Sequence, residues 1–166
     1  SQHGVAIGAL AGKTTQGENS VAIGKEAGET TQGTKAVAIG SLAGNDTQGN
    51  STVAIGDNAG QTTQSQHGIA IGAQAGQTTQ GTSSLAIGKQ AGKVNQGNEA
   101  VAIGNLAGVN NQAANSIVIN AGPTDLENIV EDVFIVKPVR AVAGALPAGF
   151  KQVAYNPTTG EFIYYG

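Results

Sequence analysis

The sequence contains no cysteine, methionine or tryptophan, and aromatic residues make up only 4% of its 166 residues. Without cysteine, neither a disulfide framework nor a thiolate metal site can form. Large apolar side chains are too scarce for an ordinary globular core. The fold must therefore pack small side chains.

Charge is scarce as well. Charged residues make up 11% of the chain, the net charge is −3, and Lys and Arg form no run. Nucleic acids and anionic membranes attract clustered positive charge, so we expect neither as a partner. No apolar run is long enough for membrane insertion. The sequence begins within a repeat, and we expect it to be part of a longer chain.

An internal repeat with a period of 16 residues dominates the sequence. Seven units follow in phase from Val5, and a truncated eighth starts at Ile117. Each unit reads roughly Val-Ala-Ile-Gly-x-x-Ala-Gly-x-Thr-Thr-Gln-Gly-x-x-x. A glycine inside a helix costs about 1 kcal/mol relative to alanine, so this glycine density excludes helices and favours strands and turns. The sequence predicts a parallel β-solenoid, or β-roll, with one repeat per turn.

The strand pattern places Val and Ile on one face of each strand and Ala and Gly on the other. We expect the branched side chains to fill the interior of the coil and the glycines to form corners at positive φ. The small-residue face would then admit a neighbouring backbone, which makes it the predicted interface with other copies of the chain. Its members are Ala6, Ala22, Ala38, Ala54, Ala70, Ala86 and Ala102.

The composition changes near Gly122, because all six aromatic residues and all four prolines follow it. We therefore divide the chain into a solenoid, residues 1–122, and a capping or trimerisation module, residues 123–166. In that module residues 125–132 read as a turn or short helix, and residues 133–136 as a strand. Residues 152–155 and 161–165 read as a β-hairpin.

The repeats resemble two families. Val-Ala-Ile-Gly-x-x-Ala-Gly is similar to the head repeats of trimeric autotransporter adhesins, although the unit here is longer and Asn-Ser precedes it only at residues 19–20 and 115–116. The run at residues 114–121, the Val-x-Pro-Val-Arg element at 136–140 and the Tyr-Asn-Pro-Thr-Thr-Gly-Glu segment at 155–161 resemble fibre proteins of phages and large DNA viruses more closely. This resemblance implies a homotrimer, a structural or receptor-binding role and no cofactor.

One glutamine column is invariant in the seven repeats, and we interpret it as a structural amide ladder. Stacked amides would hydrogen-bond along the coil. Its members are Gln16, Gln32, Gln48, Gln64, Gln80, Gln96 and Gln112.

Other polar positions suggest weaker hypotheses. A threonine column from Thr15 to Thr79 could form an ice-binding surface, but it ends at Asn95. His3 and His67 share one repeat position and could meet at a threefold axis to hold a metal, although exposed loop histidines are far commoner. No nucleophile, base and orienting group recur together, so we expect no enzyme activity.

Contact with a receptor would use variable outer positions or the aromatic C-terminal residues, because Tyr and Phe stack on sugars and anchor protein contacts. The candidates are Tyr155, Phe162, Tyr164 and Tyr165; packing within the cap is the competing explanation for them.

The sequence predicts a structural and attachment segment of a trimeric viral or phage fibre, with a host-surface glycan or protein as partner and a location on a virion or cell surface. The alternatives are a trimeric autotransporter-like adhesin head, an ice-binding β-solenoid and a passive spacer.

Overall fold

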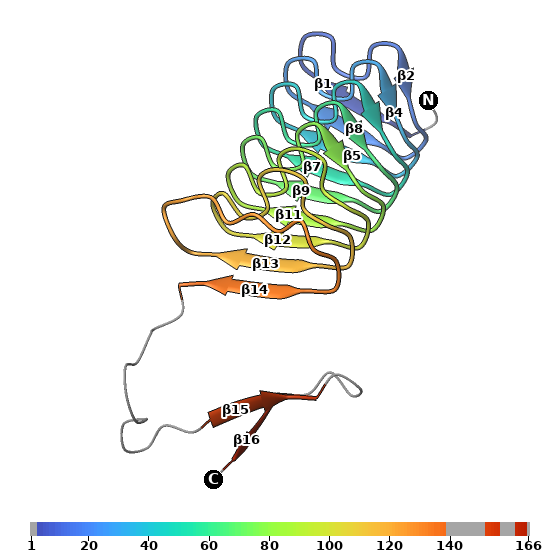
Figure 1. Ribbon diagram of the computed structural model, residues 1–166. Coiled ribbons are helices and arrows are strands. Elements are labelled where there is room, and N and C mark those ends of the chain that lie inside the picture. Colours follow the sequence, from blue (N-terminus) through green and yellow to red (C-terminus); the bar gives the residue numbers. More distant parts are fainter. Residues whose placement is uncertain (1–2, 139–151, 157–161, 166) are drawn as a thin grey trace.

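The computed structural model describes residues 3–138, 152–156 and 162–165. It forms a parallel β-solenoid of about eight turns with a repeat of about 16 residues (Figure 1). The predicted all-β fold and the predicted period are confirmed.

Two parallel sheets form the walls of the coil, and each turn before the last few contributes one strand to each sheet. The longer sheet has nine strands: β1 (Val5–Ile7), β3 (Val21–Ile23), β5 (Val37–Ile39), β7 (Val53–Ile55), β9 (Ile69–Ile71), β11 (Leu85–Ile87), β12 (Val101–Ile103), β13 (Ile117–Asn120) and β14 (Phe134–Lys137). The shorter sheet has five: β2 (Thr15–Gln16), β4 (Thr31–Gln32), β6 (Thr47–Gln48), β8 (Thr63–Gln64) and β10 (Thr79–Gln80).

The repeat sets the register, because each residue lies opposite its own copy in the next turn. Val37 pairs with Val53, Ala38 with Ala54 and Ile39 with Ile55. A one-residue slip would turn every side chain to the other face of its strand, so the 16-residue phase must be kept in every turn.

The interior of the coil is lined by the smallest side chains, which corrects the predicted orientation of the strands. The Ala column of the strands is fully buried within one chain from Ala22 to Ala102, and it faces a second Ala column from Ala27 to Ala107. Only Ala6, in the first turn, is exposed. Val and Ile point outward.

The predicted interface residues therefore cannot contact another chain. This correction applies to Ala22, Ala38, Ala54, Ala70, Ala86 and Ala102, each with an exposed fraction of 0%. The physical reason is the width of the coil. A Cβ added at Gly28 would lie 3.0 Å from the Cδ of Gln32, so the interior has no space for branched side chains.

The glycine that follows each long strand from β1 to β12 is required by the backbone, as the sequence predicts. Gly40 has a φ of +130°, and a Cβ there would lie 2.5 Å from the carbonyl oxygen of Gly56 in the next turn. L-residues rarely adopt this φ, and the next turn leaves no space for a side chain.

The coil continues past the change in composition at Gly122. Strand β14 pairs in parallel with β13, with Phe134 opposite Ile117 and Val136 opposite Ile119. Residues 125–132 contain no helix, so of the two predicted alternatives the turn is correct. Asn120 is buried, and its Nδ2 donates hydrogen bonds to the carbonyl oxygens of Asn105, at 2.9 Å, and Thr124, at 2.8 Å.

The C-terminal hairpin is present. Strands β15 (Gln152–Tyr155) and β16 (Phe162–Tyr165) pair antiparallel, with Tyr155 opposite Phe162. The turn between them, from residue 157 to residue 161, and the end of the Val-x-Pro-Val-Arg element lie outside the described residues.

Candidate interaction surface

The glutamine column lies inside the coil and is engaged by the chain itself. From Gln32 to Gln112 each side chain has an exposed fraction of at most 2%. Each Nε2 donates to the carbonyl oxygen of the first residue of the preceding long strand, as from Gln64 to Val53 O at 2.8 Å.

Hydrogen bonds also join some neighbours along the column, whereas Oε1 of Gln32, Gln48 and Gln96 has no hydrogen-bond partner among the described residues. Gln64 Nε2 lies 3.0 Å from Gln80 Oε1, and Gln96 Nε2 lies 3.2 Å from Gln112 Oε1. Because the amides are sealed between the two Ala columns, a ligand outside the coil cannot reach them.

The outer surface of the nine-stranded sheet is the largest candidate interaction surface. We call it the Val/Ile face. Its two columns are Val5, Val21, Val37, Val53, Ile69, Leu85, Val101, Ile117 and Phe134, and Ile7, Ile23, Ile39, Ile55, Ile71, Ile87, Ile103, Ile119 and Val136. Every member is at least partly exposed in the single chain.

The Val/Ile face is uniformly apolar. Exposed fractions reach 58% at Ile7, 40% at Ile117 and 49% at Phe134. At a parallel-strand spacing of about 4.8 Å, nine strands give a stripe about 38 Å long. Monomeric soluble proteins rarely expose a contiguous apolar surface larger than a few hundred Å².

Sequence reasoning missed this face, but the repeats carry a signal for it. The first column accepts Val, Ile, Leu and Phe, which is typical of an open position, whereas the inner Ala columns accept no other residue within the seven repeats. The Ile column is just as constant although it lies on the outside of the coil.

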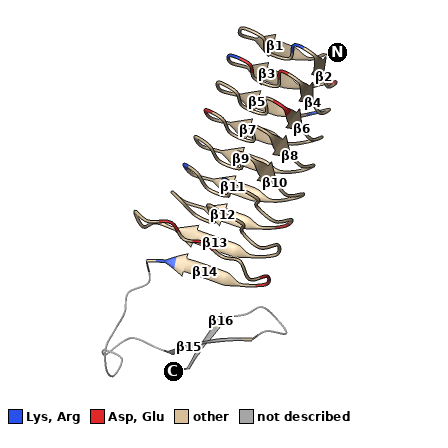
Figure 2. Ribbon diagram, turned by 45° about the horizontal axis from the view of Figure 1, so that its top comes forward, with Lys and Arg blue, Asp and Glu red and all other residues tan. Residues whose placement is uncertain are grey.

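Charged residues lie mainly in the turns between strands, at the corners of the coil (Figure 2). Two corners border the Val/Ile face. The Val-side corner comprises the residues three and two positions before each first-column residue, such as Thr34 and Lys35. The Ile-side corner comprises the two residues after each glycine that ends a long strand, such as Lys25 and Glu26.

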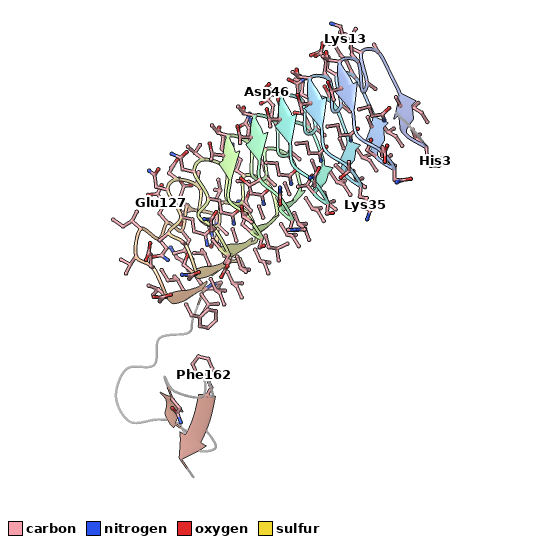
Figure 3. The ribbon with its side chains drawn as sticks, turned by 90° about the vertical axis from the view of Figure 1, so that its right-hand side faces the viewer. His3, Lys13, Lys35, Asp46, Glu127 and Phe162 are labelled. Atoms are coloured by element: carbon pink, nitrogen blue, oxygen red, sulfur yellow. The ribbon has the colours of Figure 1, made fainter. Side chains whose placement is uncertain are left out.

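A third set of charged and polar residues lies away from the Val/Ile face. This set includes Lys13 and Asp46, which Figure 3 shows along one edge of the coil. The Val-side corner, with His3 and Lys35, lies along the opposite edge. Lys13 forms an ion pair with Glu29 in the next turn, with 3.2 Å between Nζ and Oε1. Asn45 Nδ2 in turn lies 3.2 Å from the other carboxylate oxygen of Glu29.

The threonine column projects from the shorter sheet. Thr31 and Thr47 are exposed and lie opposite each other in parallel register, and Thr79 is exposed at the end of the column. His3 and His67 are also exposed, at the Val-side corner. Among the described residues, no three His, Asp or Glu side chains gather closely enough to hold a metal ion.

Of the four predicted receptor contacts, Phe162 can be placed. It is 61% exposed, and its ring centroid lies 6.2 Å from that of Phe134 in an edge-to-face arrangement. The side chains of Tyr155, Tyr164 and Tyr165 lie outside the described residues. No helix in the described part of the chain is long and apolar enough to cross a bilayer.

These features define the chain as a β-solenoid repeat protein. Searches against models of known protein families, curated proteins and solved structures gave no match.

Proposed function

We propose that this chain is a rigid segment of a homotrimeric viral or phage fibre, in which three copies associate through the Val/Ile face. The observation that carries the proposal is the unbroken row of at least partly exposed apolar side chains along nine strands. The number three and the fibre setting come from the resemblance of the repeats and the C-terminal motifs to viral fibre proteins.

A second copy of the chain is the partner that suits this face best. The apolar columns repeat at one strand spacing along the whole length, so only a partner with the same period can cover every turn. A parallel copy has that period by construction. Closed rotational symmetry then hides the face of each copy against its neighbours without leaving an open apolar surface.

The mechanism of such a segment is geometric. Parallel backbone hydrogen bonds join successive turns, as from Gly40 N to Ile23 O at 2.8 Å and from Gly56 N to Ile39 O at 2.8 Å. Three coils packed along one axis resist bending better than one coil. Attachment to a host-surface glycan or protein would use the outer corners or the aromatic C-terminal residues, including the exposed Phe162.

A matched pair of substitutions in one turn tests the association. Ile39→Asp places a charge on the Val/Ile face, and Thr47→Asp places the same charge on the opposite sheet. Burying an unpaired carboxylate is strongly unfavourable, so Ile39→Asp should produce monomers while Thr47→Asp remains trimeric. Circular dichroism should show that both variants keep the coil. A trimeric Ile39→Asp variant would contradict the proposed interface.

Ice binding is the second candidate, and the exposed threonine column is the observation that favours it. The column is short, because Asn95 and Asn111 replace threonine in the last turns. An ice-binding solenoid would show thermal hysteresis that Thr31→Leu and Thr63→Leu abolish. A fibre segment or an adhesin head would show none, and an adhesin head would bind host cells or glycans as an isolated fragment.

A further inference from the structure

The corners that border the Val/Ile face carry charges in a pattern that sets how neighbouring chains align. At the Val-side corner the charged or basic residues are His3, Glu18, Lys35, His67, Glu99, Glu131 and Asp132, and at the Ile-side corner they are Lys25, Glu26, Asp57 and Lys89. Both corners form regular stacks, with Glu99 N donating to Thr82 O at 2.9 Å and Leu106 N donating to Lys89 O at 3.0 Å.

Two corners of one chain cannot pair with each other. In a single turn six residues separate Glu99 from Asn105, which at about 3.3 Å per residue leaves the corners roughly 15–20 Å apart. Among the described residues, the ion pairs are Lys13–Glu29 and Lys25–Glu26, and neither spans the face. A charge at one corner could therefore meet a charge at the other corner only in another chain.

Parallel copies arranged around an axis along the coil bring opposite corners together. Rotation about that axis keeps every residue at its own height and places the Val-side corner of one chain against the Ile-side corner of the next. An antiparallel pair would instead bring together two corners of the same kind.

The pitch of the coil leaves two alignments open. The chain advances about 4.8 Å per turn, so the Ile-side corner of the same turn lies about 2 Å beyond the Val-side corner, and that of the preceding turn lies about 3 Å before it. These two axial offsets are nearly equal, and a long side chain can span either distance. The residues at the corners must decide between them.

The charges favour the preceding turn. With that alignment Glu99 faces Lys89, Lys35 faces Glu26 beside Lys25, and His67 lies opposite the carboxylate of Asp57. With the same-turn alignment, none of these three residues faces an opposite charge. Glu99 then faces Asn105 and Leu106, and His67 faces Ala73 and Gln74. Lys35 faces Ser41 and Leu42. That alignment gains only a contact of Glu18 with Lys25, which is already paired with Glu26 at 3.2 Å in its own chain.

We propose that neighbouring chains lie parallel and that the Val-side corner of each turn pairs with the Ile-side corner of the preceding turn in the next chain, through Glu99 with Lys89, Lys35 with Glu26, and His67 with Asp57. The inference rests on the proposed self-association, and it adds the orientation and stagger of the chains. Opposite charges at an interface fix register more than they add affinity, which suits a surface whose apolar columns look alike in every turn.

Charge reversal tests the stagger. Glu99→Lys and Lys89→Glu should each lower the melting temperature of the trimer by several degrees at low salt, and the double variant should recover at least half of the loss. The matched control combines Glu99→Lys with Lys93→Glu, because Lys93 stacks in the column of Lys13, away from the face. That combination should recover nothing. Equal recovery in both double variants would overturn the pairing.

Zero-length carbodiimide cross-linking of the unaltered chain, read by mass spectrometry, gives an independent result. The stagger predicts Glu99–Lys89 and Glu26–Lys35 cross-links between chains, whereas the same-turn alignment predicts Glu18–Lys25. The Lys13–Glu29 pair, at 3.2 Å within one chain, reports that the reagent has reacted. A trimer that yields Glu18–Lys25 alone overturns the stagger and leaves the fibre proposal standing; a monomer overturns both.

Discussion

At the scale of single residues, size decides which side chains enter the coil. Each full turn inside the coil buries two alanines and one glutamine, with a further small residue such as Thr52 or Ser84 beside them, and the glutamine amide donates to a backbone carbonyl oxygen of the long strand. Hydrophobicity does not decide it, since the more apolar Val and Ile remain outside. Ala54, which is buried, and Val53, which is partly exposed, are neighbours in β7, so the effects of enlarging each side chain can be compared directly.

Ala54→Leu should lower the free energy of unfolding by about 1–3 kcal/mol, because three extra carbon atoms would be forced into a filled interior. Val53→Leu should change it by no more than about 0.5 kcal/mol, because Leu85 already occupies that column. Thermal unfolding followed by circular dichroism compares the two. Equal losses would contradict the orientation of the strand.

Gln64→Leu removes three donated hydrogen bonds from the interior, to Val53 O, Gly68 O and Gln80 Oε1. Gly68 O keeps its hydrogen bond from Val53 N, but Gln80 Oε1 loses this donor inside the coil, which should cost about 1–3 kcal/mol. Gln61→Leu is the control, because Gln61 accepts its hydrogen bond from Gln77 on the outside of the coil, and it should be nearly neutral. Chemical denaturation measures both; a neutral Gln64→Leu would mean that the amide ladder contributes nothing to stability.

At the scale of strands and turns, the repeat is the unit of structure. Each strand contacts its copies in the turns before and after, so stability accumulates turn by turn. The sequence is sufficient to predict the parallel stacking, the glycine corners and the hairpin of β15 and β16. It also predicts that Val37 and Ile39 share one face of β5 while Ala38 takes the other.

Which face points inward could not be predicted from alternation alone. A period of two says which residues lie together, and the choice between inside and outside depends on the volume that 16 residues can enclose. For the same reason, the sequence predicts an interface on the Ala column and not on the Val/Ile face. The position of β14 was also unexpected, since its sequence, Phe-Ile-Val-Lys, lacks the repeat pattern.

Deleting one whole repeat, residues 53–68, should leave a shorter coil with the same far-ultraviolet circular dichroism and a melting temperature only a few degrees lower. Each column then stacks on its own copy again, with Val37 opposite Ile69. Deleting residues 53–67 leaves the later turns out of phase by one residue and exchanges the buried and exposed faces, which should prevent folding beyond the junction. Equal folding of the two variants would contradict the turn-by-turn register.

At the scale of the whole molecule, the coil is a rod with two unlike sides. The shorter sheet is covered by threonines and polar corners, whereas the longer sheet presents the Val/Ile face over nine strands. The described chain places nothing over the apolar side apart from the contact between Phe134 and Phe162. Self-association is the central claim because it explains both the exposed face and the constant Ile column.

The mass of the purified chain in solution, measured by light scattering at low micromolar concentration, tests that claim most directly. The account predicts a mass near three times 16.4 kDa. A mass of 16.4 kDa that persists as the concentration rises would contradict it. The Val/Ile face would then be exposed in the native protein, and the threonine surface would become the first candidate for function.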